Sequence, residues 1–211
     1  MKNILVLANS VMHNKSCIAG KIVETGEWVR LKGQDHKGIS LKEQCLNREE
    51  NCDTHSCTCI RLKNPNILNI IRVKRLTSIV DSIHQIENYS FDTSVPWKIQ
   101  TIERNILDSF LDNPDTIWGN SSSVCISELR EGSLYFLKVD SIKLSISVHK
   151  KRKAKILYKG TLYDFSVTAR EFDTLFSENK NEFIAYITVS LGEVFGSSAY
   201  KLVAGIIKIG G

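Results

Sequence analysis

The chain has 211 residues, of which 42% are hydrophobic and 24% are charged, and its net charge is +5. These proportions are typical of a globular protein and exclude a disordered, collagen-like or coiled-coil chain. The positive charge permits a polyanionic partner without requiring one.

The apolar runs of the sequence are short. The run at residues 4–8 is far below the ~20 residues of a membrane span and below the roughly 7–15 apolar residues of a secretion signal. We therefore expect a cytoplasmic protein that does not bind membranes.

Short runs with strand-like patterning predict β-structure in the first part of the chain. Residues 17–23 and 27–32 flank a Gly-containing turn and are typical of a hairpin. The polar stretch 33–58 is too long for a simple turn and is expected to be an insertion. The expected strands are residues 3–9, 17–23, 27–32, 59–63 and 67–76.

The periodicity changes in the middle of the chain. Six apolar residues follow each other at spacings of three and four, which predicts one amphipathic helix over residues 98–112. Asn113 and Pro114 end it. The apolar positions are Ile99, Ile102, Ile106, Leu107, Phe110 and Leu111.

Strand-like patterning returns in the second half, with one short helix expected over residues 170–180. Many short strands and a central helix predict a mainly β protein of two small barrels, although a single sandwich fits the same pattern. We expect a first barrel over residues 1–96, a connecting helix over 97–114 and a second barrel over 115–211. The strands expected in the second half are residues 133–139, 142–148, 154–158, 161–167, 185–190 and 201–209.

A cluster of thiols lies in the polar stretch. Because nothing in the sequence indicates export, disulfides explain this cluster poorly, whereas thiolate and imidazole are ligands of tetrahedral Zn²⁺. The alternative is a Cys-rich loop without metal. If zinc binds, we expect a structural role, with the ligands Cys45, Cys52, Cys57 and Cys59 and with His55 as a substitute.

The densest run of positive charge lies between two expected strands, so we expect it at the end of a hairpin. Phosphate groups can neutralise such a run, but a solvated turn that protects an edge strand fits equally well. Nearby aromatic residues at positions 135, 136, 158, 163 and 165 fit a barrel core better than a base-stacking surface. The candidate phosphate-binding residues are Lys150, Lys151, Arg152, Lys153 and Lys155.

An ordered series of short motifs resembles the dual OB-fold domain family of prokaryotes, from about residue 3 to about residue 208. Two departures are Leu31, where the family usually has proline, and the Cys/His cluster, which is not a family feature. The motifs are Lys15 with Cys17-x-Ala19-Gly20, Gly26-x-Trp28-Val29-Arg30, Gln85-x-Glu87-Asn88-Tyr89, Ile117-Trp118, Ser133-Leu134, Tyr163-x-Phe165-x-Val167-Thr168, Ser190-Leu191-Gly192-Glu193-x-Phe195 and Tyr200-Lys201-Leu202-Val203-Ala204.

The resemblance implies two OB barrels and a role in nucleic-acid recognition within a genome-defence system, often beside an effector protein. We expect a non-enzymatic module that binds single strands or structured ends. One alternative is a pocket protein, or an enzyme, for a nucleotide-like ligand, and another is an adaptor that docks a protein through an exposed apolar patch. The candidate pocket residues are Lys15, Cys17, Arg30, Gln85, Glu87, Asn88 and Lys201.

Overall fold

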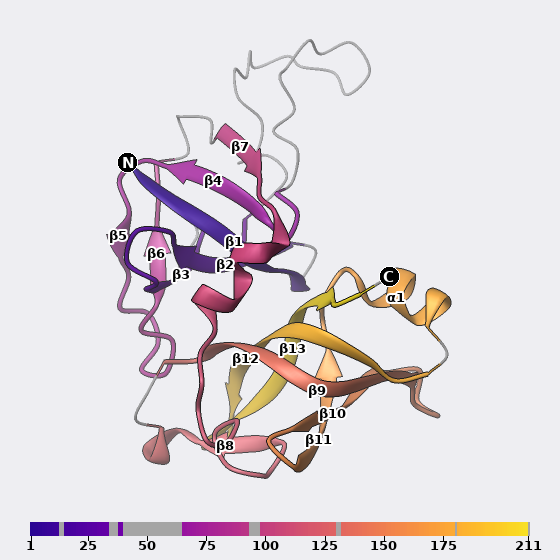
Figure 1. The fold of residues 1–211 in the computed structure, drawn as a ribbon. Helices are drawn as coiled ribbons and strands as arrows, with labels where there is room; N and C mark the ends of the chain where they lie inside the picture. Colours follow the sequence, from indigo (N-terminus) through magenta and orange to yellow (C-terminus); the bar gives the residue numbers. More distant parts are fainter. Residues whose placement is uncertain are drawn as a thin grey trace, which may run out of the picture.

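The computed structural model describes residues 1–12, 15–33, 38–39, 65–92, 98–129, 132–179 and 181–210. These residues are mainly β, as predicted, and form two sheets of seven and six strands. Figure 1 shows the two units one above the other, with the N-terminus in the upper unit and the C-terminus beside the lower one. Within the described residues, no helix is long and apolar enough to cross a bilayer.

Barrel 1 is formed by the first six strands of the chain. Its sheet runs in the order β5-β6-β3-β2-β1-β4, and β3 lies parallel to β6. Residues 74–76 join β4 to β5 at the two ends of this sheet, and Arg75 there has a φ of +54°. The chain itself therefore links the ends of the curved sheet. The strands are β1 (Lys2–Met12), β2 (Lys15–Ile22), β3 (Trp28–Leu31), β4 (Asn69–Val73), β5 (Thr77–Ser78) and β6 (Asn88–Ser90).

The helix predicted over residues 98–112 is wrong for its first part. Residues Lys98–Thr101 form strand β7, which pairs with the free edge of β4. Only Arg104–Phe110 is helical, as the 3-10 helix η2. Leu107 and Phe110 are its buried residues, and their spacing of three matches a 3-10 turn. Pairing with β4 thus replaces the first helical turns.

Barrel 2 closes on itself. Its strands form the ring β9-β10-β11-β13-β12, because β11 pairs in parallel with β13 in addition to its sheet neighbours. This strand order, with a helix between the third and fourth strands, is that of an OB barrel. The elements are β8 (Ser123–Cys125), η3 (Ile126–Glu128), β9 (Leu134–Ile146), β10 (Arg152–Tyr158), β11 (Thr161–Val167), α1 (Phe172–Glu178), β12 (Phe183–Phe195) and β13 (Ser198–Lys208).

Strand β9 replaces two strands of the sequence prediction. It pairs with β12 through its first half and with β10 through its second half. An irregularity in the β9–β12 pairing, between Phe183 and Ala185, lets one strand bend between both partners. The β10–β11 hairpin turns at Lys159 and Gly160, which both have positive φ, as a two-residue turn of type I′ requires.

The two barrels pack through the outer faces of β1 and β13. Each barrel has its own apolar core, and a third apolar cluster, which includes Leu7, Phe136 and Ile207, joins them. A Cβ atom at Gly205 would lie 2.4 Å from the Leu7 carbonyl oxygen. Glycine is therefore required for the two strands to approach this closely.

Candidate functional site

Polar residues of barrel 1 meet barrel 2 at a buried junction. Arg30 lies on β3, and its backbone N–H donates to the carbonyl of Glu87 at 2.7 Å, next to the parallel pairing of β3 with β6. On the side of barrel 2, Ser133 directly precedes β9, and Ser190 lies on β12 opposite Leu134, the first residue of β9. Four of the short motifs are thus brought together from positions up to 160 residues apart.

The centre of the junction is an ion pair. The Nη2 atom of Arg30 lies 3.1 Å from Oε1 of Glu87 and donates to the hydroxyl groups of Ser133 at 2.8 Å and Ser190 at 3.2 Å. Ser133 in turn donates from its hydroxyl and its backbone N–H to the Glu87 carboxylate. Arg30, Glu87 and Ser133 are buried, and the network joins the two barrels at the edge of a cleft that Arg30 and Ser190 line.

The loop of residues 79–87 adds two further contacts between the barrels. His84 donates from Nε2 to the Gly192 carbonyl at 2.9 Å, and Gln85 donates to the Leu191 carbonyl at 3.2 Å. The pairing of β12 with β13 is irregular between Leu191 and Val194. A bulge of this kind exposes backbone carbonyls to side-chain donors, so it explains why the loop docks there.

A cleft of ≈340 Å³ opens beside this junction. Its lining comes from both barrels and includes Cys17, Arg30, Lys32, His84, Gln85 and Glu193. The charged lining residues Arg30 and Lys32 are balanced by Asp81 and Glu193. The volume is near the lower end of small-molecule pockets, so the cleft accommodates one compact ligand rather than a polymer.

The model of the dual OB-containing domain matches residues 2–206. The chain belongs to this family. No curated protein and no solved structure matches it. The family assignment agrees with the topology of both barrels and confirms the fold expected from the motif series.

The candidate pocket residues of this dual OB domain fall into four groups, of which Lys201 is the last. Cys17, Arg30 and Gln85 line the cleft. Glu87 and Asn88 lie behind it, where Asn88 donates to Asp81 at 2.6 Å and to Gln85 at 3.4 Å. Lys15 begins β2, two residues before Cys17, and is not a lining residue of the cleft.

Lys201 belongs to a separate site within barrel 2. Its ammonium group donates to the carbonyls of Trp118, Gly119 and Ser121 at 2.9, 3.0 and 2.6 Å. Burial lowers the pKa of Lys201 to about 8. Trp118 and Gly119 both have positive φ, so this lysine holds an irregular turn in place.

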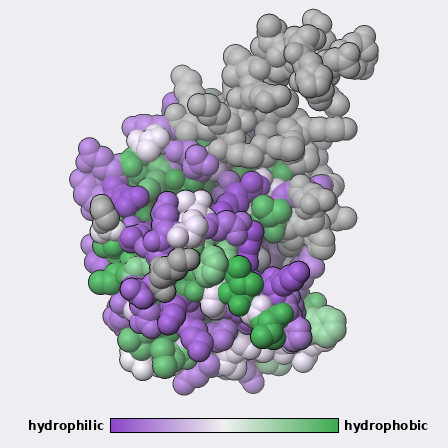
Figure 2. Space-filling view, turned by 90° about the vertical axis from the view of Figure 1, so that its right-hand side faces the viewer, coloured by the Kyte–Doolittle hydropathy of each residue, from purple (hydrophilic) through white to green (hydrophobic). Residues whose placement is uncertain are grey.

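The cation run does project from a hairpin end. Lys150 and Lys151 lie in the β9–β10 turn, and the other three candidates lie on β10. Arg152 pairs with Asp173 at 2.6 Å and Lys153 with Asp164 at 3.3 Å. Figure 2 faces this end of the molecule, where apolar side chains lie between many hydrophilic ones.

Lys143 extends the cation run onto a neighbouring strand. It lies opposite Lys155 in the β9–β10 register, and both side chains are exposed. The sequence prediction did not include Lys143, although its apolar neighbours Ile142 and Leu144 indicate an outward position on a strand. With it, six cations lie on the second half of β9, on β10 and in the turn between them.

Asp112, which the sequence did not single out, accepts hydrogen bonds from both barrels. Asp112 accepts from the ammonium of Lys21 at 2.6 Å, from the indole N–H of Trp28 at 3.0 Å and from the backbone N–H of Phe136 at 2.8 Å. It therefore links barrel 1 to barrel 2. A lysine inside the apolar run of residues 17–23 was the available signal, because such a residue needs a buried partner.

The proposed zinc ligands Cys45, Cys52, His55, Cys57 and Cys59 lie outside the described residues. Among the residues that are described, no group of three or more His, Cys, Asp or Glu side chains is placed to hold a metal ion. Cys17 and Cys125 are free thiols.

Proposed function

We propose that this dual OB domain is a non-enzymatic module that binds single-stranded nucleic acid or structured ends on barrel 2. The polyanion lies on the outer face of β9, β10 and β11 and against the β9–β10 turn. The observation that carries the proposal is the set of six cations on this surface, which are Lys143, Lys150, Lys151, Arg152, Lys153 and Lys155.

OB barrels bind oligonucleotides on the face of their second and third strands. In barrel 1 that face carries Ala19, Lys21 and Arg30, which are at most 4% exposed because barrel 2 packs against them. In barrel 2 the corresponding face carries the exposed residues Lys155 and Leu162. Barrel 2 is therefore the one whose binding face is open.

The form of recognition follows from the side chains on this face. Tyr158, Tyr163 and Phe165 are buried in the core of barrel 2, so they do not stack on bases. Ionic contacts to phosphates then dominate the free energy of binding, which predicts sequence-tolerant and strongly salt-dependent binding. The seven-residue helix α1 is too short to serve as a recognition helix in a major groove.

The test is a salt titration with fluorescently labelled dT20 and rU20. Each phosphate contact on a single strand contributes about −0.7 to the slope of log K against log salt. Replacing Lys150, Lys151 and Lys155 by Ser should flatten the slope by about 2 units. The matched control replaces Lys2, Arg72 and Arg75, exposed cations of barrel 1, and should leave the slope unchanged. Absence of binding by the wild-type protein at low salt would refute the proposal.

A second candidate function is binding of a nucleotide-like small ligand in the cleft. It is favoured by the convergence of Cys17, Arg30 and Gln85 on one cavity. Thermal shift with nucleosides and nucleoside monophosphates tests it, because a cleft ligand should raise the melting temperature of the wild type and less so that of Lys32→Met. The bonds that Arg30, His84 and Gln85 already make across the barrels favour a binding role over catalysis.

Two further parts of the proposal rest on the sequence. Structural zinc bound by the Cys/His cluster would stabilise the long insertion between β3 and β4. A place in a prokaryotic defence system, beside an effector protein, rests on the family resemblance.

A further inference from the structure

Exposed apolar side chains gather where two loops of different barrels meet. Ile83 and Ile86 lie on the 79–87 loop of barrel 1, with exposures of 89% and 67%. Val194 and Phe195 lie at the end of β12 in barrel 2, with exposures of 44% and 78%. We call these four residues the apolar shelf. Singly exposed aliphatic residues are ordinary, but a group of them around a hollow marks an interaction surface.

A hollow of ≈320 Å³ is lined by Ile83 and Val194 of the shelf, whereas Ile86 and Phe195 lie nearby in the chain and are not among its lining residues. Ile83, Ile126 and Val194 provide apolar lining, and residues from both barrels close its sides. The hollow is built on fixed elements, because His84 is bonded to Ser82 and to the Gly192 carbonyl, and β8 pairs with β13. A bulky side chain can therefore enter a preformed site.

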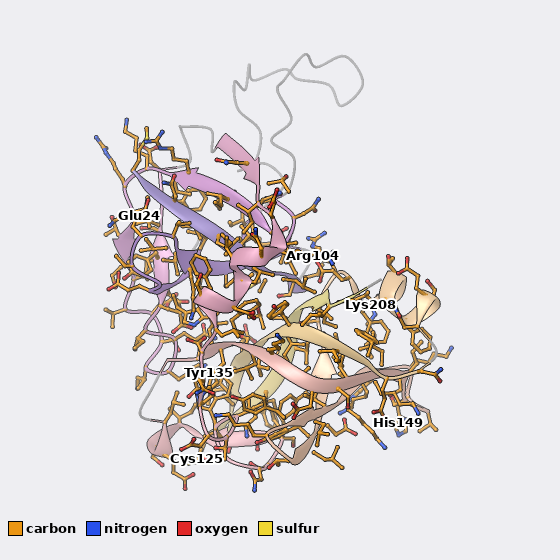
Figure 3. The ribbon with its side chains drawn as sticks, viewed as in Figure 1. Glu24, Arg104, Cys125, Tyr135, His149 and Lys208 are labelled. Carbon is orange, nitrogen blue, oxygen red and sulfur yellow. The ribbon has the colours of Figure 1, made fainter. Side chains whose placement is uncertain are left out.

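Carboxylates border this surface. Glu193 precedes Val194 directly, and Glu128 ends η3, three residues after Cys125, a lining residue of the hollow. Both glutamates are exposed, and within the described residues neither forms an ion pair. Figure 3 places Cys125, which lines the hollow, and His149, which lies in the β9–β10 turn, at opposite ends of barrel 2. The shelf is therefore far from the cationic hairpin formed by β9, β10 and their turn.

We propose that the apolar shelf docks a partner protein through a segment that inserts one bulky apolar side chain into the hollow and carries Lys or Arg beside it. The apolar lining selects the anchor, and Glu128 and Glu193 select the flanking cations. A nucleic acid does not fit this surface, because its phosphates would face unpaired carboxylates. The inference is independent of nucleic-acid binding, which uses the other end of barrel 2.

The experiment is selection from a random peptide library displayed on phage. The library is first depleted on the double variant Ile83→Asp and Val194→Asp, which changes two exposed lining residues of the hollow, and then selected on the wild-type chain. We expect enriched peptides that combine a large apolar residue with flanking Lys or Arg. Their affinity should fall at least tenfold for the double variant. Enrichment of acidic or purely polar peptides, or no enrichment, would overturn the proposal.

Controls distinguish peptide binding at the shelf from nonspecific hydrophobic binding and from self-association of the chain. Val148 is 93% exposed on the cationic hairpin, so Val148→Asp should leave peptide affinity unchanged. Because all three replaced side chains are exposed, the unfolding midpoints should equal that of the wild type. Light scattering over a range of protein concentrations tests a second copy as the occupant, and dimerisation that is lost in the double variant would contradict a foreign partner.

Discussion

Nη2 of Arg30 and Oε1 of Glu87 lie 3.1 Å apart, with only 3% and 5% of these side chains exposed. Both residues belong to barrel 1, yet their side chains also form hydrogen bonds with Ser133 and Ser190 of barrel 2. An ion pair of this kind costs desolvation energy that the attraction only offsets with good geometry. Its value here is that it fixes one orientation of the two barrels.

Removing one partner of this pair should strongly destabilise the protein. We expect Arg30→Met and Glu87→Gln each to lower the free energy of unfolding by about 3–5 kcal/mol, because each leaves buried polar groups without partners. The double variant should lose less unfolding free energy than the two single variants lose together. Urea unfolding measures these values.

The exposed pair Lys153–Asp164 is the control for the junction pair. Its nitrogen and oxygen lie 3.3 Å apart, but the side chains are 31% and 55% exposed. Lys153→Met should therefore cost at most about 1 kcal/mol. If the Arg30 and Lys153 variants lose equal amounts of unfolding free energy, the buried junction pair contributes no more to stability than an exposed pair.

Strand patterning in the sequence predicted most of the fold because alternation reports burial directly. Residues 161–167, for example, alternate between core and surface and form β11 with the same bounds. The prediction for residues 98–112 was wrong in its first part because apolar residues three and four apart are typical of a helix. In the structure, the first four of these residues pair with the free edge of β4 instead. Local periodicity does not show whether a strand from elsewhere in the chain is available for pairing.

The junction was predictable as a set of residues but not as an arrangement. Arg30, Gln85 and Glu87 were singled out as polar members of motifs, yet their meeting with Ser190 depends on how two barrels pack. Lys201 carried the same kind of signal and holds a turn of barrel 2 instead. The sequence marks a buried polar residue without showing which partner satisfies it.

Gly205 should tolerate no larger side chain. A Cβ atom there would lie 2.4 Å from the Leu7 carbonyl oxygen and 3.3 Å from Cα of Ala8. Because these are backbone atoms of barrel 1, Gly205→Val must separate the barrels, at a cost of about 1–3 kcal/mol or more. Ser166→Val, on the open face of β11, is the control. Thermal unfolding that is unaltered in Gly205→Val would contradict the described packing.

Lys201 should make stability depend on alkaline pH. Its pKa is about 8 in the folded chain, against 10.5 for an ordinary lysine. Between these values the unfolded chain binds a proton that the folded chain has lost, so raising the pH favours folding. This gain in stability is complete above pH 10.5, and it is lost as the pH falls through 8.

Lys201→Met removes this titration and leaves three carbonyls without a donor. It should cost about 1–3 kcal/mol at pH 7, and the gap to the wild type should widen between pH 7.5 and 9.5. Denaturant unfolding across this range measures the gap. A gap that stays constant would show that Lys201 keeps an ordinary pKa.

The Cys/His cluster should bind one Zn²⁺ per chain. Four thiols and one imidazole within 15 residues provide a full tetrahedral set. Elemental analysis of protein purified without metal-affinity chromatography should give a ratio near one, and replacing Cys57 and Cys59 by Ser should reduce it to near zero. All four thiols reacting freely in the native protein would rule out the site.

Asp164 and Asp173 should weaken nucleic-acid binding, because each neutralises a cation on the proposed binding face of barrel 2. Asp164→Asn and Asp173→Asn free Lys153 and Arg152 for phosphates, and each should strengthen binding of labelled dT20 by about 0.2–1 kcal/mol, or roughly 1.4- to 5-fold. The gain should shrink as salt is added, since the contacts are exposed. Asp115→Asn is the control, because Asp115 is fully exposed and pairs loosely, at 3.9 Å, with Lys159 at the other end of the β10–β11 hairpin. Weaker binding by both variants would mean that the carboxylates position the cations rather than compete for them.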